Sequence, residues 1–319
     1  MKKKILITGC AGFIGSNLVD FLLKKNFEII GIDNLSTGNI KFLKNAIKNK
    51  KFTFYKKDLF KNKISRYFKD ISIVYHLAAN ADVRFGLKHT KKDINQNIIV
   101  THKILEEMKK HNVKKIVFSS SGSIYGESNQ IPTKEDTPFP IQTSLYGASK
   151  ISAEGLISAY CEGFNFKSYI FRFVSILGER YSHGHVFDFV KQLKKNNKKL
   201  YVLGDGNQKK SYLNIDDCIS AIHRSINYFN DKINIINLGT DEYLTVKESI
   251  KVISDTLKCK PKLFFKGGKR GWIGDNPFIF LDTKKIKKTG WKPKFTIRES
   301  IKITTKYLID NKWILKRKI

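Results

Sequence analysis

The sequence predicts an α/β fold: a doubly wound parallel sheet of the Rossmann type with a smaller, partly interleaved C-terminal substrate lobe. Short runs rich in β-branched residues alternate with segments of helix length through the first half of the chain, a pattern typical of parallel βαβ units. The glycine-rich segment 8–15 follows the first such run and precedes an apolar helical pattern. Segment 144–150 places a phenol and an ammonium four residues apart, on one helical face.

The elements follow in order along the chain. Strands are expected over residues 5–8, 28–33, 51–55, 71–76, 113–119 and 166–173, and helices over 13–25, 90–111 and 146–164. Ser144 is the expected N-cap of the last of these helices. After about Val174 the alternation breaks, and a strand near 233–238 and a helix from about Thr245 are expected. We therefore expect a dinucleotide-binding domain over 1–174, with a returning segment over about 211–240, and a substrate-binding lobe over 175–210 and 241–319.

Composition narrows the class of protein. The 319 residues carry a formal net charge of +32, and most of the excess is lysine spread singly or in pairs. Because base readers and phosphate clamps favour arginine, this pattern indicates a solvated lysine-rich surface rather than a nucleic-acid site. No apolar run reaches the roughly 18 residues that a membrane span needs. The first apolar run leads straight into the glycine segment, so it reads as a strand rather than a signal peptide, and a cytoplasmic protein is expected.

Four widely scattered cysteines, without a C-x-x-C pair, favour neither a metal site nor a disulfide framework. They are Cys10, Cys161, Cys218 and Cys259.

The glycine-rich turn predicts a dinucleotide site. Gly9, Gly12 and Gly15 permit the tight bend, the close approach of backbone to a pyrophosphate, and helix-on-strand packing. Asp33, eighteen residues past Gly15 at the end of the second strand, would accept hydrogen bonds from the ribose hydroxyls and repel a 2′-phosphate. This favours NAD over NADP, although Asp33 could simply end a strand. The remaining expected cofactor contacts are Phe13, Ile14, Asn34, Asp58, Leu59, Leu77, Ala78, Ala79, Asn97 and Ser119.

Tyr146 and Lys150 form the expected catalytic pair, and both would also contact the cofactor. A tyrosine needs its pKa lowered by about three units, or about 4 kcal/mol, to act as a base near neutral pH. One ammonium about 4 Å away, at an effective dielectric of about 20, supplies nearly that much. Ser121, at the end of the fifth strand, is placed to hydrogen-bond the reacting oxygen. The alternative is that Ser121 is only one of three serines at a strand end.

Taken together, these motifs resemble the extended short-chain dehydrogenases that act on nucleotide sugars. The similar segments are TGCAGFIG, DNLSTG, HLAA, FSSSGSIYG, YGASK and DTKKIKKTGWKP, in the family's order from about Lys4 to Pro293. The resemblance implies Tyr146 as base, Lys150 as cofactor holder and pKa tuner, and Ser121 as hydroxyl partner. It also implies homodimers, for which segments 90–111 and 146–164 are the candidate contact helices.

The two residues after Ser121 favour one reaction within that family. The family's 4,6-dehydratases carry an acidic pair there, and its decarboxylases carry a glutamate at the second position. Gly122 and Ser123 offer no carboxyl group. A transient 4-keto sugar is then expected to take its hydride back on the other face, which is 4-epimerisation with NAD staying bound. The alternatives are a nucleotide-sugar dehydratase, decarboxylase or 4-oxidoreductase of the same family, or a dinucleotide-sensing scaffold without chemistry.

Residues for the nucleotide sugar are expected mainly in the second half. Lys210 and Ser211 stand where the family has Arg-Asp, and Ser175 stands where it has asparagine. These departures leave open which nucleotide and which sugar bind, with a UDP-hexose or its acetamido or uronic relative expected. The full set of expected substrate contacts is Arg84, Ser121, Ser123, Tyr146, Ser175, Lys210, Arg270 and Asp275.

Overall fold

The computed structural model describes residues 4–80, 88–138, 141–271, 276 and 278–316. Contacts within the chain divide it into two compact units. The first, here called the sheet unit, takes the chain up to residue 124 together with 144–172 and 222–236. The second unit takes residues 125–143, 173–221 and the chain from 237 onward.

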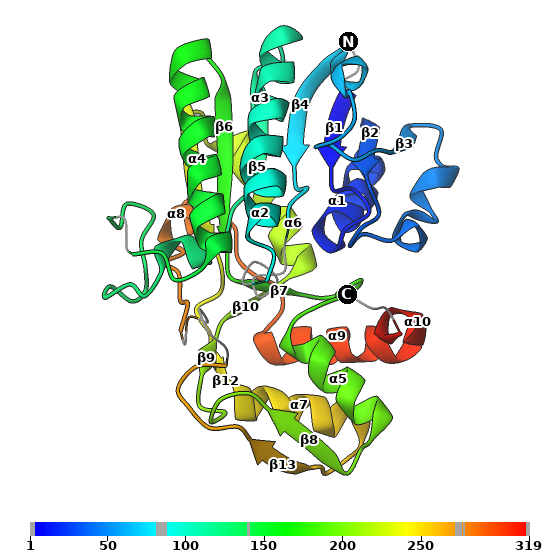
Figure 1. The fold of residues 1–319 in the computed structure, drawn as a ribbon, viewed down its shortest axis with the longest axis vertical. Helices are drawn as coiled ribbons and strands as arrows, with labels where there is room; N and C mark the ends of the chain where they lie inside the picture. Colours follow the sequence, from blue (N-terminus) through cyan, green and yellow to red (C-terminus); the bar gives the residue numbers. More distant parts are fainter. Residues whose placement is uncertain (1–3, 81–87, 139–140, 272–275, 277, 317–319) are drawn as a thin grey trace. The chain divides into compact units, whose positions relative to one another are not determined.

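A seven-stranded sheet organises the first unit, and its order is β11-β6-β5-β4-β1-β2-β3 (Figure 1). Strands β1 to β6 pair in parallel throughout, which confirms the predicted parallel sheet. The order reverses direction between β1 and β4, and ligands of such sheets bind outside the carboxyl ends at this point. The strands are β1 (Lys4–Thr8), β2 (Glu28–Asp33), β3 (Phe52–Lys56), β4 (Ile71–His76), β5 (Lys115–Ser119), β6 (Lys167–Phe173) and β11 (Ile233–Leu238).

Helices cover both faces of this sheet. Helices α3 (Val100–Lys110) and α4 (Leu145–Phe164) lie over one face and share a buried core with the strands, including Ile104, Ile116 and Ile157. Helix α1 (Phe13–Lys24) lies beside α6 (Ile215–Tyr228), where the Phe21 and His223 rings meet edge to face. The short 3₁₀ segments are η1 (Ile40–Leu43), η2 (Ala46–Lys48), η3 (Ser65–Phe68) and η6 (Gly122–Tyr125).

The helix expected over 90–111 is interrupted. It begins as α2 (Thr90–Asp93), widens into a π-helical segment, η5 (Ile94–Ile99), and continues as α3. Such π segments occur frequently at functional sites. This one carries Asn97, an expected cofactor contact.

In its described residues, the second unit combines helices with three two-stranded sheets. Helices α7 (Val246–Leu257) and α9 (Ile297–Asp310) each begin with a capping box, Thr245 with Glu248 and Thr296 with Glu299. The other helices are α5 (His185–Lys195), α8 (Lys284–Lys287) and α10 (Lys312–Leu315). The strands are β7 (Ser175–Leu177), β8 (Lys199–Val202), β9 (Lys209–Lys210), β10 (Tyr212–Asn214), β12 (Leu244–Thr245) and β13 (Lys262–Phe265).

Among the residues described, no helix combines the length and the apolar character that crossing a membrane requires. The same residues contain no cluster of three or more histidine, cysteine or acidic side chains suited to a metal ion. All four cysteines are free thiols.

Ser144 caps the helix that carries Tyr146 and Lys150, as the sequence predicts: its Oγ accepts the Gly147 N–H at 3.1 Å. Replacing it, Ser144→Ala, leaves that amide without its partner and should lower the free energy of unfolding by about 1 kcal/mol. Urea unfolding followed by circular dichroism measures the change. Ser144→Asn retains a capping oxygen and should remain near the wild-type midpoint. An unchanged midpoint for Ser144→Ala would contradict the role of the cap.

Candidate active site

The glycine-rich turn connects β1 to α1 and leaves no room for side chains. Gly9 has φ +71°, which favours glycine, and a Cβ there would lie 2.7 Å from the Ala78 amide nitrogen. A Cβ on Gly15 would lie only 2.1 Å from the Gly9 carbonyl oxygen. Gly12, the N-cap of α1, contributes no side-chain cap. The turn therefore presents the backbone of a helix N-terminus, the arrangement that binds pyrophosphates.

Asp33 lies at the carboxyl end of β2 and touches this turn. Its Oδ2 accepts the Ala11 N–H at 2.9 Å and its Oδ1 accepts the Leu35 N–H at 2.7 Å. Burial raises the pKa of Asp33, while these two amide hydrogen bonds oppose the rise. Each carboxylate oxygen keeps acceptor capacity beyond one hydrogen bond, so the group remains able to accept ribose hydroxyls.

A second carboxylate, that of Asp58, lies in the loop after β3. The Asn34 Nδ2 donates to Asp58 Oδ2 at 3.0 Å, and the amides of Phe60 and Lys61 donate to Asp58 Oδ1. Burial raises the pKa of Asp58, but these hydrogen bonds together hold it below its usual value. Lys103, on α3, donates from Nζ to three carbonyl oxygens of this loop, those of Leu59, Phe60 and Asn62.

A buried chain of hydrogen bonds lies at the point where the strand order reverses. The Thr8 Oγ1 is 2.8 Å from His76 Nδ1, and His76 Nε2 is 3.1 Å from Thr101 Oγ1. Thr101 in turn donates to the Asn97 carbonyl oxygen at 2.6 Å. Burial, with the nearby Lys150 charge, lowers the pKa of His76 to about 3, so this ring is neutral at physiological pH.

The π segment brings Asn97 next to α4. Its Nδ2 donates to Ser149 Oγ at 2.8 Å, and its Oδ1 accepts the Asn80 N–H at 2.8 Å. The Ser149 Oγ donates to the Tyr146 carbonyl oxygen at 2.8 Å. Asp93, 1% exposed, accepts a hydrogen bond from Asn80 Nδ2 at 2.8 Å. These contacts tie the turn after β4 to the first turns of α4.

The neighbouring Leu77 N–H donates to the Thr8 carbonyl at 3.2 Å, and the predicted contacts Ala78 and Ala79 follow it.

The structure gathers Tyr146, Lys150 and Ser121 at the carboxyl end of β5. Lys150 Nζ donates to the Ser119 carbonyl oxygen at 2.7 Å and lies 5.9 Å from the centre of the Tyr146 ring. Tyr146 hydrogen-bonds with the Ser121 side chain. Ser123 also contacts that hydroxyl, since its Oγ donates to Ser121 Oγ at 2.9 Å.

The electrostatics of this group differ from the sequence expectation. Burial raises the pKa of Tyr146 to about 12, and the Ser121 hydrogen bond offsets this only in part. Burial also lowers the pKa of Lys150 to about 7, although the charges of Glu154 and Asp93 oppose that change. The sequence expectation that one ammonium nearly suffices to bring Tyr146 to neutral pH counts only the attraction between the two groups. Burial opposes that attraction, because it disfavours the charged form of both groups.

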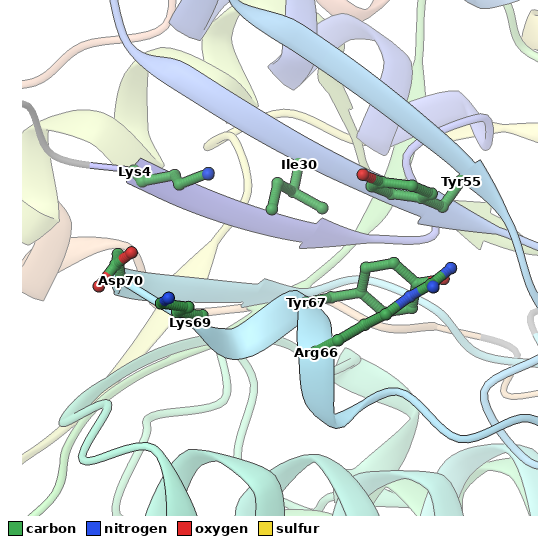
Figure 2. Close-up of a pocket in the computed structure, with 7 residues that line it drawn as sticks. All are labelled: Lys4, Ile30, Tyr55, Arg66, Tyr67, Lys69 and Asp70. Carbon is green, nitrogen blue, oxygen red and sulfur yellow. The ribbon is translucent and has the colours of Figure 1, made fainter.

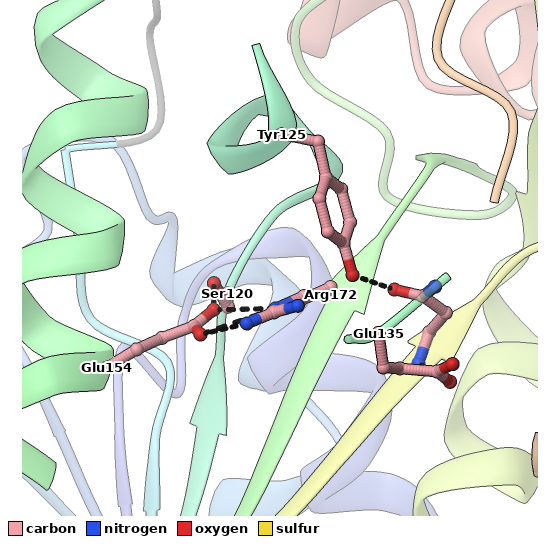
Figure 3. Close-up of polar contacts among 6 residues, drawn as sticks. Ser120, Tyr125, Glu135, Glu154 and Arg172 are labelled. Atoms are coloured by element: carbon pink, nitrogen blue, oxygen red, sulfur yellow. Dashed lines mark hydrogen bonds and ion pairs between the residues drawn. The ribbon is translucent and has the colours of Figure 1, made fainter. Parts of the chain in front are cut away.

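The three serines at the end of β5 have three different partners on α4. Ser119 accepts Lys150 through its carbonyl, Ser120 donates its hydroxyl to Glu154 Oε1, and Ser121 hydrogen-bonds Tyr146. Glu154 is also paired with Arg172 of β6, at 2.8 Å between Oε2 and Nη2 (Figure 3). Ser121 is thus distinguished from its neighbours by its contact, which argues against the view that it is only one of three equivalent serines.

Sequence reasoning missed several residues that hold this site. For Glu154 a signal was available, because it follows Lys150 by four residues and Tyr146 by eight and so shares their helical face. Asn80 and Asp93 had no such signal, since their partners come from other elements. Nothing in the sequence distinguishes Lys103 from the many other lysines of the chain.

The expected substrate residues of the second unit lie on separate elements. Lys210, in β9, donates from Nζ to the Asn276 carbonyl at 2.9 Å. Ser175 begins β7 and is exposed, with Tyr212 of β10 as its neighbour in register. Arg270 forms an exposed ion pair with Glu127. Arg84 and Asp275 lie outside the described residues.

A cavity of about 330 Å³ lies elsewhere in the sheet unit (Figure 2). Arg66 lies over the Tyr67 ring, 4.8 Å from its centre, while Lys4 and Asp70 stand at the amino ends of β1 and β4. Ligands of open parallel sheets bind at the carboxyl ends. This cavity is therefore separate from the site around Tyr146.

Comparison with known proteins agrees with this geometry. A model of the NAD dependent epimerase/dehydratase family matches residues 5–239. The UDP-glucuronate 4-epimerase of Thermodesulfobacterium geofontis is 30% identical, over 98% of this chain and 98% of its own.

Two crystal structures are also similar over nearly the whole chain. A UDP-galactose 4-epimerase is 30% identical with a TM-score of 0.87, over 97% of this chain and 100% of its own. The UDP-glucuronic acid 4-epimerase of Bacillus cereus, in complex with UDP-glucuronic acid and NAD, is 27% identical with a TM-score of 0.89, over 97% and 99%. The named relatives are isomerases. The chain itself belongs to the NAD dependent epimerase/dehydratase family.

Proposed function

We propose that this protein is a nucleotide-sugar 4-epimerase that uses NAD and acts on a UDP-hexose or its acetamido or uronic relative through a transient 4-keto sugar. One observation carries the proposal. Tyr146, Lys150 and Ser121 meet at the carboxyl end of β5, and the two residues after Ser121 provide no carboxyl group.

The β1–α1 turn and Asp33 fit NAD. The space that a Cβ on Gly9 or Gly15 would fill is closed, so the backbone itself faces the ligand, and α1 offers its N-terminus to the pyrophosphate. Asp33 would accept the ribose hydroxyls, and a 2′-phosphate would bring like charge against it. When bound, NAD would supply a reversible hydride acceptor for C4 of the sugar, and its positive ring would favour a neighbouring phenolate.

Tyr146 and Lys150 act as one titrating pair. With pKa values of about 12 and about 7, the pair loses its first proton near neutral pH and holds a single proton above that range. The reactive arrangement has that proton on Lys150 and leaves Tyr146 as the base for the sugar 4-hydroxyl. Ser121 positions the same hydroxyl, and its own oxygen is held by Ser123.

The described acids around this pair are committed to other partners, which supports epimerisation over dehydration. Glu154 is 3% exposed and bound by Arg172 and Ser120, and Asp93 is 1% exposed and bound by Asn80. Elimination of water from a 4-keto sugar needs an accessible acid and base. Without them, returning the hydride to the other face of the sugar is the simplest outcome.

Lys210 and Ser175 support a diphosphate-linked substrate without specifying its sugar. Lys210 offers one point charge to a phosphate, where an arginine would offer a bidentate grip. Relatives named for glucose, galactose and glucuronate occur at similar identity, so the sugar has to be measured.

The reaction is tested by proton NMR of the purified protein with UDP-glucose, UDP-N-acetylglucosamine and UDP-glucuronate, each alone and without added cofactor. We expect the 4-epimer of one of them to accumulate to equilibrium, because a redox-neutral cycle consumes no NAD. A deoxy, decarboxylated or oxidised product after NAD addition would contradict the proposal, as would no turnover of any nucleotide sugar.

Tyr146→Phe should lower kcat by at least about 100-fold, because it removes the general base. The NAD content, measured after denaturation, should remain unchanged. Tyr160→Phe is the matched control on the same helix, since the Tyr160 hydroxyl bonds Glu106 away from the pair. Retained turnover in Tyr146→Phe would refute the assigned base and favour a scaffold that binds the dinucleotide without chemistry.

Gly15→Ala should abolish most NAD binding, because its Cβ would meet the backbone of Gly9 and Cys10 at 2.1 and 2.9 Å. Gly155→Ala is the control: this exposed α4 position has nothing within 4 Å of a Cβ. Removing a helical glycine should even stabilise the fold by about 0.5–1 kcal/mol. Absorbance of released NAD and thermal unfolding measure the two effects. Full NAD content in a folded Gly15→Ala protein would contradict the site.

A further inference from the structure

We propose that Glu154, held by Arg172, is the positioning residue that keeps the buried Lys150 side chain protonated and so sets the pH at which the Tyr146–Lys150 pair becomes active. The proposal rests on the proposed function for its kinetic consequence. Its structural part concerns only residues of the sheet unit.

The geometry of α4 places these groups in one line. Tyr146, Lys150 and Glu154 follow each other at intervals of four residues, and each reaches a different serine at the end of β5. Glu154 therefore lies one helical turn beyond the ammonium, on the same face. Its charge acts on Lys150 through a region from which water is excluded, since Lys150 is 2% and Glu154 3% exposed.

Arg172 fixes the carboxylate in that place. Its Nε lies 3.2 and 3.3 Å from Glu154 Oε1 and Oε2, and its Nη2 lies 2.8 Å from Oε2. Ser120 donates to Oε1 from the other side (Figure 3). The Ser120 N–H is itself bound by the Phe171 carbonyl at 2.8 Å, so the contact is anchored to both strands. A carboxylate bound in this way has few rotamers left and cannot turn towards a substrate.

The other groups around Lys150 do not replace this charge. Tyr146 is neutral in the resting state, and His76 of β4 is neutral because burial lowers its pKa to about 3. From β5 come the Ser119 carbonyl and the Phe118 ring, whose centre lies 4.7 Å from Nζ. Among the described residues, the charge of Asp93 of α2 also opposes the fall in the Lys150 pKa, with a smaller effect than that of Glu154.

The expected kinetic effect has a definite sign. The pair must lose one proton before Tyr146 can act as a base, and a nearby negative charge opposes that loss. Removing the charge should move the rising, acidic limb of the kcat profile to lower pH, by about one to three pH units. It should also lower the plateau, because the remaining proton then resides less often on Lys150.

Glu154→Gln tests this, since glutamine keeps the shape and the acceptor for Ser120 but carries no charge. The variant leaves Arg172 buried without its partner, which endangers folding. The double variant Glu154→Gln with Arg172→Gln removes both charges, and its acidic limb should also lie below that of the wild type. Glu154→Asp retains the charge and should keep the wild-type midpoint. Glu162→Gln, on the same helix but in an exposed pair with Lys232, should change nothing.

A second readout does not depend on turnover. In protein labelled with ¹³C at the lysine ε-carbon, Lys150 should be the signal that titrates near neutral pH, identified by its absence from Lys150→Arg. This titration should move to lower pH in Glu154→Gln or in the double variant, and remain in place in Glu154→Asp and Glu162→Gln.

The results separate the two proposals. Midpoints that stay at the wild-type value in a folded Glu154→Gln or double variant would overturn the role of Glu154, because a purely structural pair lowers the rate or stability without moving them. Absence of turnover by the wild type would overturn the proposed function instead, while the lysine titration would still decide the role of Glu154.

Discussion

Holding one ammonium ion away from water is the constraint on which the centre of this protein depends. Lys150 is 2% exposed and donates to the Ser119 carbonyl, while Glu154 and Asp93 oppose the fall in its pKa that burial causes. Arg172 in turn balances the charge of Glu154, with which it forms a buried ion pair. An uncompensated charge at such depth would cost several kcal/mol. The carboxyl ends of β5 and β6 and one face of α4 supply the groups that meet this cost.

The parallel sheet delivers the remaining parts of the site to the same edge. The glycine turn, Asp33 and His76 all stand at carboxyl ends of neighbouring strands, at the place where the strand order reverses. The hydrogen-bonded chain through Thr8, His76 and Thr101 links that edge to the π segment. Because the histidine is neutral, this chain orients groups without adding a charge that would compete with Lys150.

The chemistry that these parts support is redox-neutral. A site with a tyrosine–lysine pair can oxidise a sugar hydroxyl, but further elimination would require a free acid close to the serine of β5. The sequence supplies Gly122 and Ser123 there, and Ser123 is used to hold Ser121. Glu154 and Asp93, whose charges act on Lys150, are bound by Arg172 and Asn80 instead. The same buried carboxylates that tune Lys150 are thereby unavailable as catalysts.

The sequence by itself determined the parallel sheet, the glycine turn, the helix cap at Ser144 and the common helical face of Tyr146 and Lys150. These features depend on residues a few positions apart, which is the range over which strand and helix periodicity operate. Only the tertiary structure decided the pKa values of Tyr146 and Lys150. It also decided the hydrogen-bond partners of Asn97 and Asp93 and the ion pair between Glu154 and Arg172. Each depends on burial or on groups from another element. The cost of removing a charge from water is a property of the assembled interior, which no local pattern records.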